Sequence, residues 1–342
     1  MEKKIICTFA AACIVKNECD IIELFIKINA RVFDKIFILD HISSDGTVLI
    51  IKKLIDDGYP VELIMLGDIE FNQSKIITNI VRKISKNNNY DYIMPIDADE
   101  FLYADDLLNI KKNIIKNIEK DKYALVRWVT YCPVKPDYFS FDAPLFENFK
   151  ARKVEPKQYY KVILGGEYAK KCIISAGNHS AKNYKYKCTP CELNLLLQHV
   201  PIRSKEQLLR KSLIGYYART LRTNKKPGDS YHFKQMIDNI RNNNYNVSFD
   251  KVYDSAIKYA APSGFELVEN SLDESLPLVG NINDKIVYKD FSKINITNDL
   301  DCYISDLVTK LKLSHRFKLK SLFFRLYTDQ KQLFRYVYSK FR

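Results

Sequence analysis

Short apolar runs alternate with amphipathic stretches through the first part of this chain, and that alternation limits the folds it can adopt. Apolar, strand-like runs cover residues 5–15, 35–39, 61–66 and 91–96. Between them, apolar residues at helical spacing cover residues 20–30, 48–57 and 74–86. Strand–helix–strand repetition with short connections predicts an α/β fold with a doubly wound, mainly parallel sheet flanked by helices. In such sheets, ligands bind at the carboxyl ends of the strands.

Two carboxylates stand two residues apart where the fourth strand ends, in Asp97-Ala98-Asp99-Glu100. Side chains alternate faces along an extended chain, so Asp97 and Asp99 can point the same way. Their like charges repel, and one carboxylate is expected to take up a proton unless a cation lies between them. Oxygen ligands without a nearby thiolate suit Mg²⁺ or Mn²⁺. The alternative is a helix start, with an Asp cap before Phe101-Leu102.

The composition describes a globular chain with ample material for a core. Of the 342 residues, 46% are hydrophobic and 28% are charged, which excludes a disordered chain. No apolar run approaches the ~20 residues that span a bilayer. Lys3-Lys4 and the apolar run after it resemble a short signal peptide, but that run continues directly into Lys16-Asn17-Glu18. We therefore interpret the run as a buried first strand and expect a cytoplasmic protein.

Eight cysteines are scattered along the chain, which fits reduced thiols in the cytosol. Cys188 and Cys191 form a CxxC pair, with Cys172 and His179 upstream. A structural zinc site is therefore an alternative use of these residues, although a single CxxC is a weak signal.

The net charge of +13 is concentrated in the tail. Residues 303–342 carry ten Lys or Arg and two Asp, a net charge of +8. Leucines recur there at near-helical spacing, so the tail is either a basic amphipathic helix on the inner face of the cytoplasmic membrane or a helical lid with a solvated basic face. Because the charge is not spread over a sheet studded with aromatic residues, we expect no nucleic-acid partner.

Phosphate-binding glycine loops are missing from the sequence. Neither G-x-x-x-x-G-K-[ST] nor G-x-G-x-x-G occurs, and the chain has only ten glycines. A phosphate ligand must therefore be held by a metal, by cationic side chains or by backbone amides at a helix start.

Four segments, taken together and in order, resemble the family 2 glycosyltransferases with a GT-A fold, and most of all the branch that carries a D-x-D-E-F run. They are IVKNE at 14–18, LDHISSDGT at 39–47, IDADEFL at 96–102 and QHVPIRSKEQ at 198–207. The resemblance implies a GT-A domain over 1–223, followed by a mostly helical C-terminal extension over 224–342 with a basic tail. The Lys225-Lys226-Pro227-Gly228 stretch marks that boundary.

The resemblance also implies a nucleotide pocket at the ends of the first two strands. Val15, Asn17 and Glu18 would line this pocket, and Asp40 would contact the base. The alternative for Asp40 is ordinary turn chemistry, because Asp and Ser favour loops.

The D-x-D-E-F run would then serve the metal. Asp97 would lie by the ribose and the metal, and Asp99 would bind the metal directly and so take part in catalysis. His199 resembles the late histidine that completes the coordination, with His179 as its competitor. Arg203 would reach the diphosphate, because a guanidinium group matches phosphate oxygens.

Three further assignments have structural alternatives. Trp128, the only tryptophan, could stack on a sugar ring or pack in the core. Lys75, with Gln73, could touch the diphosphate at a helix start or belong to a solvated face. Inverting transfer also needs a carboxylate base. We favour Glu147, but no spacing selects it over its rivals, which are Asp137, Asp142, Glu155 and Glu167.

These residues predict a metal-dependent, inverting glycosyltransferase of the hexosyltransferase type, with Mn²⁺ or Mg²⁺ as cofactor. The resemblance implies that the donor is a nucleotide-diphosphate sugar, with UDP as the nucleotide. The acceptor would be a glycan or lipid-linked glycan, as in surface polysaccharide or lipopolysaccharide synthesis. Two alternatives stay open. One is a nucleotidyltransferase on a similar sheet, and the other is a non-enzymatic, basic nucleic-acid-binding protein.

Overall fold

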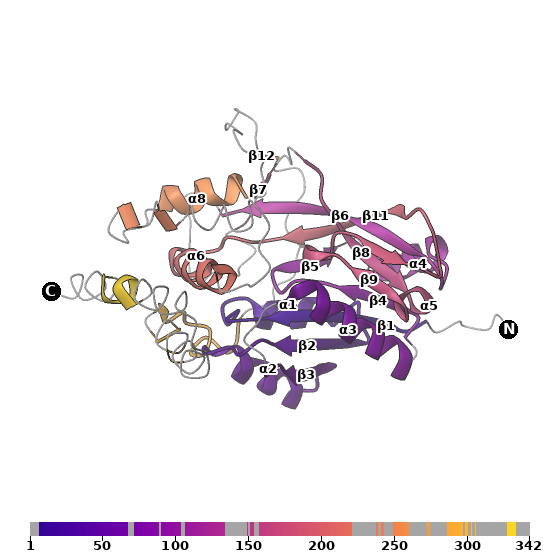
Figure 1. Cartoon of the computed structure of the whole chain (residues 1–342), viewed down its shortest axis with the longest axis horizontal. Coiled ribbons are helices and arrows are strands. Elements are labelled where there is room, and N and C mark those ends of the chain that lie inside the picture. The colour runs from indigo at the N-terminus through magenta and orange to yellow at the C-terminus, as the bar shows by residue number, and fades with distance from the viewer. Residues whose placement is uncertain are drawn as a thin grey trace.

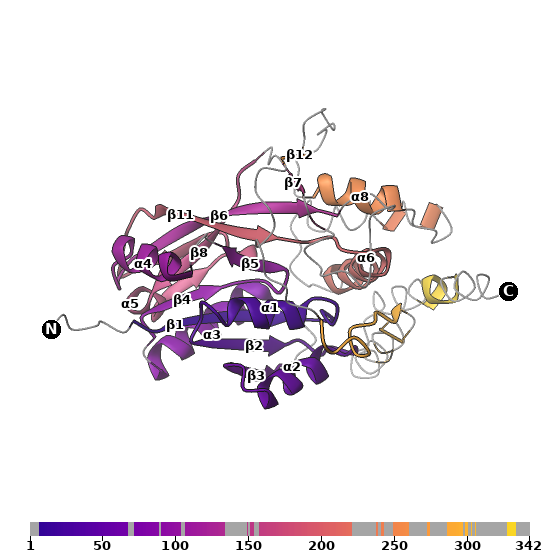
Figure 2. The same cartoon turned by 180° about the vertical axis from the view of Figure 1, so that it is seen from behind.

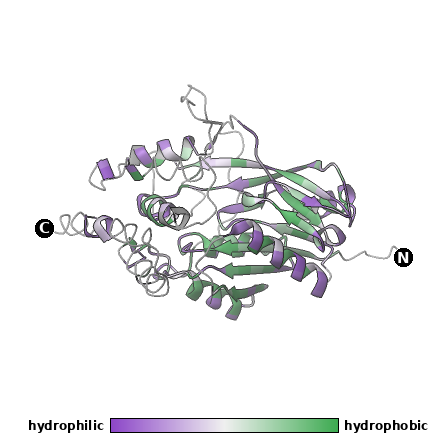
Figure 3. Ribbon diagram, in the orientation of Figure 1, coloured by the Kyte–Doolittle hydropathy of each residue, from purple (hydrophilic) through white to green (hydrophobic). Residues whose placement is uncertain are grey.

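The computed structural model describes most of the first 220 residues and separate pieces of the remainder. The described residues are 7–67, 72–88, 90–103, 107–133, 149, 151–153, 157–220, 237–238, 241–242, 249–259, 272–273, 286–296, 298–299, 302, 305 and 327–332. They form one large mixed sheet with helices on its faces (Figure 1). The strands of this sheet are largely hydrophobic (Figure 3).

The first part of the chain forms the parallel part of the sheet. Its elements are β1 (Phe9–Val15), α1 (Ile22–Asn29), β2 (Lys35–Asp40), α2 (Thr47–Asp56), β3 (Val61–Met65), α3 (Gln73–Asn87) and β4 (Tyr92–Pro95). The strand order is β4-β1-β2-β3, and every neighbouring pair is parallel. Apolar side chains of α1 and α2 pack in one core cluster, and those of α3 pack in a second one. The neighbouring residues Ala11 and Ala12 of β1 point to opposite faces of the sheet and belong to different core clusters. Helices α1 and α2 therefore cover one face of the sheet, and α3 covers the other. The predicted doubly wound, mainly parallel α/β fold is confirmed.

The second part of the sheet is mixed. It contains β5 (Glu100–Tyr103), β6 (Tyr123–Cys132), β7 (Ala151–Lys153), β8 (Tyr160–Gly165), β11 (Cys191–His199) and β12 (Leu272–Asp273). Strand β8 lies between β4 and β6 and is antiparallel to both, whereas β11 is parallel to β6. A separate hairpin joins β9 (Cys172–Ile174) and β10 (Ala181–Asn183), with a short 3₁₀ turn at Ala176–Asn178 between them.

The helix start considered as an alternative for the carboxylate run is wrong. The residues after Asp99 form β5, which pairs antiparallel with β11 and sets Leu102 opposite Leu197. Both Phe101 and Leu102 are buried, so burial on both faces of this short strand outweighs the local capping pattern.

The other described helices are α4 (Leu107–Asn117), α5 (Gly166–Ala169), α6 (Lys205–Thr220) and α8 (Phe249–Ile257). Both α6 and α8 lie at the end of the molecule opposite the N-terminus, and the arrowhead of β2 points toward that end (Figures 1 and 2). The carboxyl ends of the parallel strands therefore face α6. Among the described residues, we find no helix with the length and apolar character needed to cross a membrane.

Part of the C-terminal region is packed on the N-terminal half. The backbone N–H groups of Val287 and Tyr288 donate to the Glu23 carboxylate at 2.8 and 3.0 Å. The Tyr288 hydroxyl donates to Asp57, the residue that follows α2. The predicted boundary at residue 223 stays a prediction, and the leucine-rich stretch of the basic tail (307–326) lies outside the described residues.

Candidate functional site

The turn between β4 and β5 places the carboxylates of Asp97 and Asp99 beside different partners. The N–H of Glu100 donates to the Asp97 carbonyl at 3.1 Å, and the N–H of Asp97 donates back to Glu100 Oε2 at 2.9 Å. This tight loop replaces the extended conformation that would have put Asp97 and Asp99 on one face. The two carboxylates consequently avoid sharing one cation, and each is stabilised separately.

Asp97 and Glu100 share a buried lysine. Lys161, from β8, is 1% exposed, and its Nζ lies 2.5 Å from Asp97 Oδ2 and 2.8 Å from Glu100 Oε1. Burial lowers the pKa of Lys161, but the two carboxylates outweigh it and raise that pKa above its usual value. The second oxygen of Asp97 accepts hydrogen bonds from the amides of Gln73 and Asn178, both at 3.3 Å. The charge of Asp97 is therefore balanced within the protein.

Asp99 has a different set of neighbours. Its Oδ1 lies 3.4 Å from His199 Nε2, and its Oδ2 lies 3.4 Å from Lys211 Nζ and 3.8 Å from Arg203 Nη1. Burial raises the pKa of Asp99, but His199, Lys211 and Arg203 outweigh it and hold that pKa well below the usual value. Burial lowers the pKa of His199 despite Asp99, which favours the neutral imidazole that binds metals.

One group of possible metal ligands occurs in the described part of the chain, and it consists of Asp99, Glu100 and His199. The ligand atoms of these three residues lie within 4.8 Å of one another. Metal–oxygen bonds of about 2.1 Å put neighbouring ligand atoms about 3 Å apart, close to the Asp99–His199 separation. The Nδ1 atom of His199 is buried without a partner among these residues. A site with a carboxylate oxygen and an imidazole nitrogen can bind Mn²⁺ or Mg²⁺. It suits Mn²⁺ better, because Mg²⁺ prefers oxygen ligands alone. Glu100 is already bound to Lys161.

The predicted metal set of Asp97, Asp99 and His199 is thus brought together only in part. Asp99 and His199 are neighbours, whereas Asp97 faces Lys161. His179, the competing histidine, donates a hydrogen bond from Nδ1 to the Tyr160 carbonyl at 2.8 Å and is not in the group with Asp99. The geometry favours His199 over His179.

The zinc alternative is contradicted. Cys172, Cys188, Cys191 and His179 are all described, and they form no group with metal-ligand spacing. The Cys172 thiol is buried against the Ala169 carbonyl at 3.4 Å, whereas Cys191 is exposed.

Trp128 lies in an aromatic cluster beside the candidate metal ligands. The ring of His179 stacks on the indole with centroids 5.5 Å apart, and the ring of His199 meets it edge-on at 4.3 Å. Tyr259, which follows α8, lies 5.4 Å from the His199 ring. Trp128 is 7% exposed, and its Nε1 is buried without a partner among the described residues. Trp128 is therefore mostly a core residue, and His179 covers one of its faces.

The predicted nucleotide-pocket residues meet at the ends of β1 and β2. Asn17 adopts a left-handed conformation (φ 56°), which an asparagine tolerates well. Its N–H donates to Ser43 Oγ at 2.9 Å, and its Oδ1 accepts from the Ser44 N–H at 2.8 Å. Asp40 is fully buried, and its Oδ2 accepts from the Ser43 N–H at 2.9 Å. Its Oδ1 is without a partner in the described part of the chain, whereas Val15 is simply buried beside it along β1.

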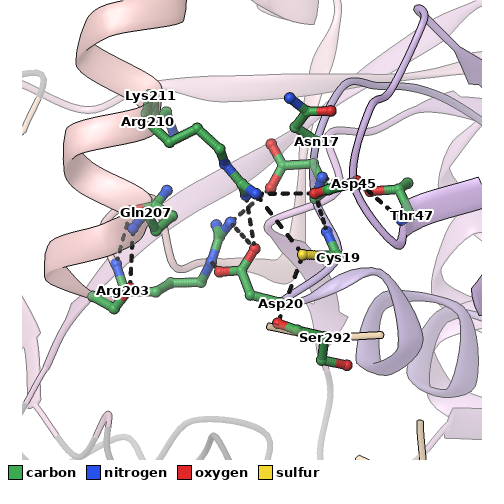
Figure 4. A network of polar contacts seen from close by, with 12 residues as sticks. Asn17, Cys19, Asp20, Asp45, Thr47, Arg203, Gln207, Arg210, Lys211 and Ser292 are labelled. Atoms are coloured by element: carbon green, nitrogen blue, oxygen red, sulfur yellow. Dashed lines mark hydrogen bonds and ion pairs between the residues drawn. The ribbon is translucent and has the colours of Figure 1, made fainter. Parts of the chain in front are cut away.

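Arg203 is built into a buried ionic network that joins α6 to the loop after β1 (Figure 4). Its guanidinium is 2% exposed and lies 2.6 Å from both Asp20 Oδ2 and Glu18 Oε2. Arg210, which lies within α6, reaches Asp20 at 3.3 Å and Asp45 at 2.9 Å. Arg203, which we expected at the diphosphate, therefore holds the loop that carries Asn17 and Glu18.

Of the remaining predicted residues, Gln73 and Lys75 belong to α3. Gln73 opens α3 and reaches Asp97, whereas the Lys75 side chain is exposed. Glu147, with Asp137, Asp142 and Glu155, lies outside the described residues. Glu167 is exposed on α5 and pairs with Lys170 at 2.5 Å.

Three residues of this site were not predicted from the sequence, and they are Lys161, Lys211 and Asn178. One signal could have revealed Lys161, since it is a lone charge in the apolar strand sequence YKVILG. A lysine is rarely buried without an acidic partner, so that pattern points to a carboxylate nearby. Lys211 and Asn178 have no comparable signal in the sequence.

Comparisons with known proteins add limited information. No protein-family model matches the chain, and no curated protein sequence matches it significantly. Among solved structures, residues 1–349 of TarS from S. aureus are similar, with 12% identity, a TM-score of 0.36, and coverage of 74% of this chain and 76% of that chain. Glucosyl-3-phosphoglycerate synthase from Mycobacterium tuberculosis, in complex with Mn²⁺ and UDP, has 17% identity, a TM-score of 0.26 and coverage of 35% of this chain and 44% of that chain.

A third similar structure is a 4-diphosphocytidyl-2C-methyl-D-erythritol synthase, with 12% identity, a TM-score of 0.34 and coverage of 68% of this chain and 100% of that chain. Similarities of this size assign no activity to the chain. Its function is therefore argued from its own residues.

Proposed function

We propose that this protein is a metal-dependent, inverting glycosyltransferase of the GT-A type that uses a nucleotide-diphosphate sugar, with UDP as the nucleotide. The observation that carries the proposal is the 3.4 Å approach of Asp99 Oδ1 and His199 Nε2 at the end of the sheet where ligands bind. The loops after β1 and β2, with Asn17 and Asp40, end at the same edge. Asp40 Oδ1, buried and unpartnered among the described residues, would accept a hydrogen bond from the base.

Asp99 and His199 would hold the metal, and Val15, Asn17, Glu18 and Asp40 would form the nucleotide pocket. A bound Mn²⁺ or Mg²⁺ would neutralise charge on the leaving diphosphate. Lys211, which lies beside Asp99, would add a positive charge on the side where the phosphates bind.

The remaining assignments concern the sugar, the diphosphate and the acceptor. Asp97, held by Lys161, would face the ribose. His179, on the face of Trp128, would border the sugar, and Lys75 would act at the outer side of the diphosphate, whereas Arg203 would support the nucleotide pocket by holding Glu18. Glu147 would take the proton from the acceptor hydroxyl as it attacks. The acceptor would be a glycan or lipid-linked glycan of a surface polysaccharide or lipopolysaccharide, reached from the inner face of the cytoplasmic membrane by the tail with its charge of +8.

A thermal-shift panel of nucleotides and nucleotide sugars, with and without Mn²⁺, tests this proposal. UDP-sugars should raise the melting temperature only when Mn²⁺ is present, because ligand binding to the native state stabilises it. Asp99→Asn should abolish that increase, and it should also lower the unliganded melting temperature, because the ionised Asp99 is stabilised by its cationic neighbours. Asp56→Asn, on an exposed residue of α2, is the matched control and should change neither quantity.

Other outcomes would support the alternatives. Stabilisation by nucleoside triphosphates, with release of pyrophosphate, would indicate a nucleotidyltransferase. Salt-sensitive binding to RNA or DNA, with no effect of any nucleotide sugar, would indicate a nucleic-acid-binding protein.

A further inference from the structure

We infer that the ammonium group of Lys161 takes the place of a cation between Asp97 and Glu100, and thereby confines a divalent metal to Asp99 and His199. The inference rests on the proposed function only in taking this edge of the sheet as a metal site. Lys161 is a positioning residue in this scheme, because it acts through the carboxylates that it holds.

The hydrogen bonds of the two carboxylates support this division. Asp97 Oδ2 is bound to Lys161, and its Oδ1 accepts from Gln73 and Asn178. Glu100 Oε1 lies 2.8 Å from Lys161 Nζ, and its Oε2 accepts from the Asp97 N–H. Three of the four carboxylate oxygens thus accept a hydrogen bond, and the fourth, Glu100 Oε1, is held by the charge of the Lys161 ammonium group without a hydrogen bond among the described residues. A metal could bind either carboxylate only by displacing one of these groups.

Asp99 is engaged much less firmly. Its nearest cationic atoms are 3.4 Å away or further, beyond the 2.7–2.9 Å of a strong charged hydrogen bond. Its Oδ1 has His199 Nε2 as the nearest of these groups, and that nitrogen is itself a potential ligand. Asp99 is consequently the carboxylate of this run that can accept a metal without breaking a close ion pair.

The position of Lys161 in the fold makes this arrangement rigid. Strand β8 pairs with β4 on one side, where Ile93 lies opposite Leu164, and with β6 on the other, where Lys161 lies opposite Val126. The lysine is 1% exposed, so solvent does not compete for its ammonium group. Glu100 is equally fixed, because it begins β5 opposite His199.

Charge explains why the lysine should weaken metal binding at Asp97 and Glu100. A divalent ion placed between those carboxylates would lie within a few ångströms of an ammonium group in a medium of low dielectric constant, where like charges repel strongly. Without the lysine, the buried carboxylate of Glu100 and the partly exposed carboxylate of Asp97 face each other and favour any cation that can replace it. Removal of Lys161 should therefore increase metal affinity, whereas loss of a purely structural residue should decrease it or leave it unchanged.

The test is a titration of the full chain with Mn²⁺ alone, followed by electron paramagnetic resonance of the free ion. Lys161→Met should bind Mn²⁺ at least about tenfold more tightly than the native protein, a free-energy difference of about 1.4 kcal/mol. Lys161→Arg keeps the charge and is the matched control, with an affinity within about threefold of native. An affinity of Lys161→Met equal to or below the native value overturns the inference.

A second variant covers the case in which Lys161→Met does not fold. Lys161→Met combined with Glu100→Gln removes one positive and one negative charge, so no additional net charge is buried. Asp97 then lacks its ammonium partner and can bind a cation in its place, so Mn²⁺ affinity should again exceed the native value. Adding Asp97→Asn to this pair should cancel the gain. Failure of the double variant to gain affinity also overturns the inference.

These measurements are independent of any nucleotide. If Mn²⁺ affinity changes as expected but no UDP compound binds the native protein, the proposed function fails and the role of Lys161 stands. If UDP-sugars bind with Mn²⁺ but the Lys161 variants gain no affinity for the metal, the proposed function stands and this inference fails.

Discussion

His199 Nε2 lies 3.4 Å from Asp99 Oδ1, although the two residues come from separate segments of the chain. Their approach follows from the backbone. Strand β11 runs antiparallel to β5 with His199 opposite Glu100, and the Val200 N–H donates to the Asp99 carbonyl at 2.9 Å. Sheet pairing therefore sets the separation of the two side chains before any ligand arrives.

Replacing His199 should remove metal binding without unfolding the protein. His199→Gln deletes the imidazole nitrogen beside Asp99, and we expect Mn²⁺ affinity to fall by at least about tenfold, as for other losses around metal sites. His179→Gln is the control, since His179 faces the Tyr160 carbonyl. Equal losses in the two variants, measured by Mn²⁺ titration, would contradict the assignment of His199.

Arg203 should matter for stability. Arg203→Met leaves Asp20 and Glu18 without their closest cation, and removal of one partner from a buried pair costs about 3–5 kcal/mol. Urea unfolding should show this loss. The control is Arg127→Met, which breaks a half-exposed pair with Glu192 and should cost at most about 1 kcal/mol. A stable Arg203→Met protein with a raised KM for the donor would instead support a contact with the diphosphate.

Asp91 should contribute to acid sensitivity. Burial raises its pKa, but the Lys120 ammonium group and hydrogen bonds from Thr8 outweigh burial and lower that pKa below the usual value. A depressed folded-state pKa adds stability above the unfolded value of about 3.9, and this stability is lost as the pH falls through the folded-state pKa. Asp91→Asn should therefore lower the urea midpoint at pH 6 and have a much smaller effect at a pH well below the unfolded value of about 3.9. Equal effects at both pH values would disprove this link.

The packing of residues 286–296 should protect a thiol. Cys19 is buried, and its Sγ lies 3.6 Å from the Ser292 carbonyl. Glu23, which is 1% exposed on its side chain, accepts the Val287 and Tyr288 N–H groups. Glu23→Ala should loosen this segment and speed alkylation of Cys19 several-fold, as local opening becomes easier.

Mass spectrometry of the alkylated peptides separates Cys19 from the equally buried Cys13, which lies in β1 away from this segment. Cys13 should keep its native rate in the same variant. Acceleration at both thiols would indicate general unfolding and would contradict a local role for Glu23.

The parallel half of the sheet could be predicted because its signals are local. Apolar periodicity identified β1 to β4 and α1 to α3 within a few residues of their observed bounds. Strand β5 was not predicted, because it has only four residues and depends on pairing with the distant β11. Strand β8 was also missed, since its lysine interrupts an otherwise apolar pattern.

The site was predictable to a similar extent. The motif located Asp99 and His199 in sequence, but the partner of Asp97 depends on the register that sets Tyr92 opposite Gly165 and so brings Lys161 to the turn. Arg203 had the right chemistry for a phosphate, yet the local sequence does not reveal that Asp20 and Glu18 already occupy it. Long-range pairing of charges decides such cases, and no local pattern encodes it.

The contacts between residues 287–288 and Glu23 bear on how the protein matures during translation. Strand β1 and helix α1 leave the ribosome early, but the two amides that bind the Glu23 carboxylate are synthesised 264 and 265 residues later. A carboxylate without those donors stays hydrated, because burying it alone is costly. The first helix therefore reaches its final environment only after residue 288 has been synthesised, and a ribosome that stalls before that point would display a nascent chain with this surface still open.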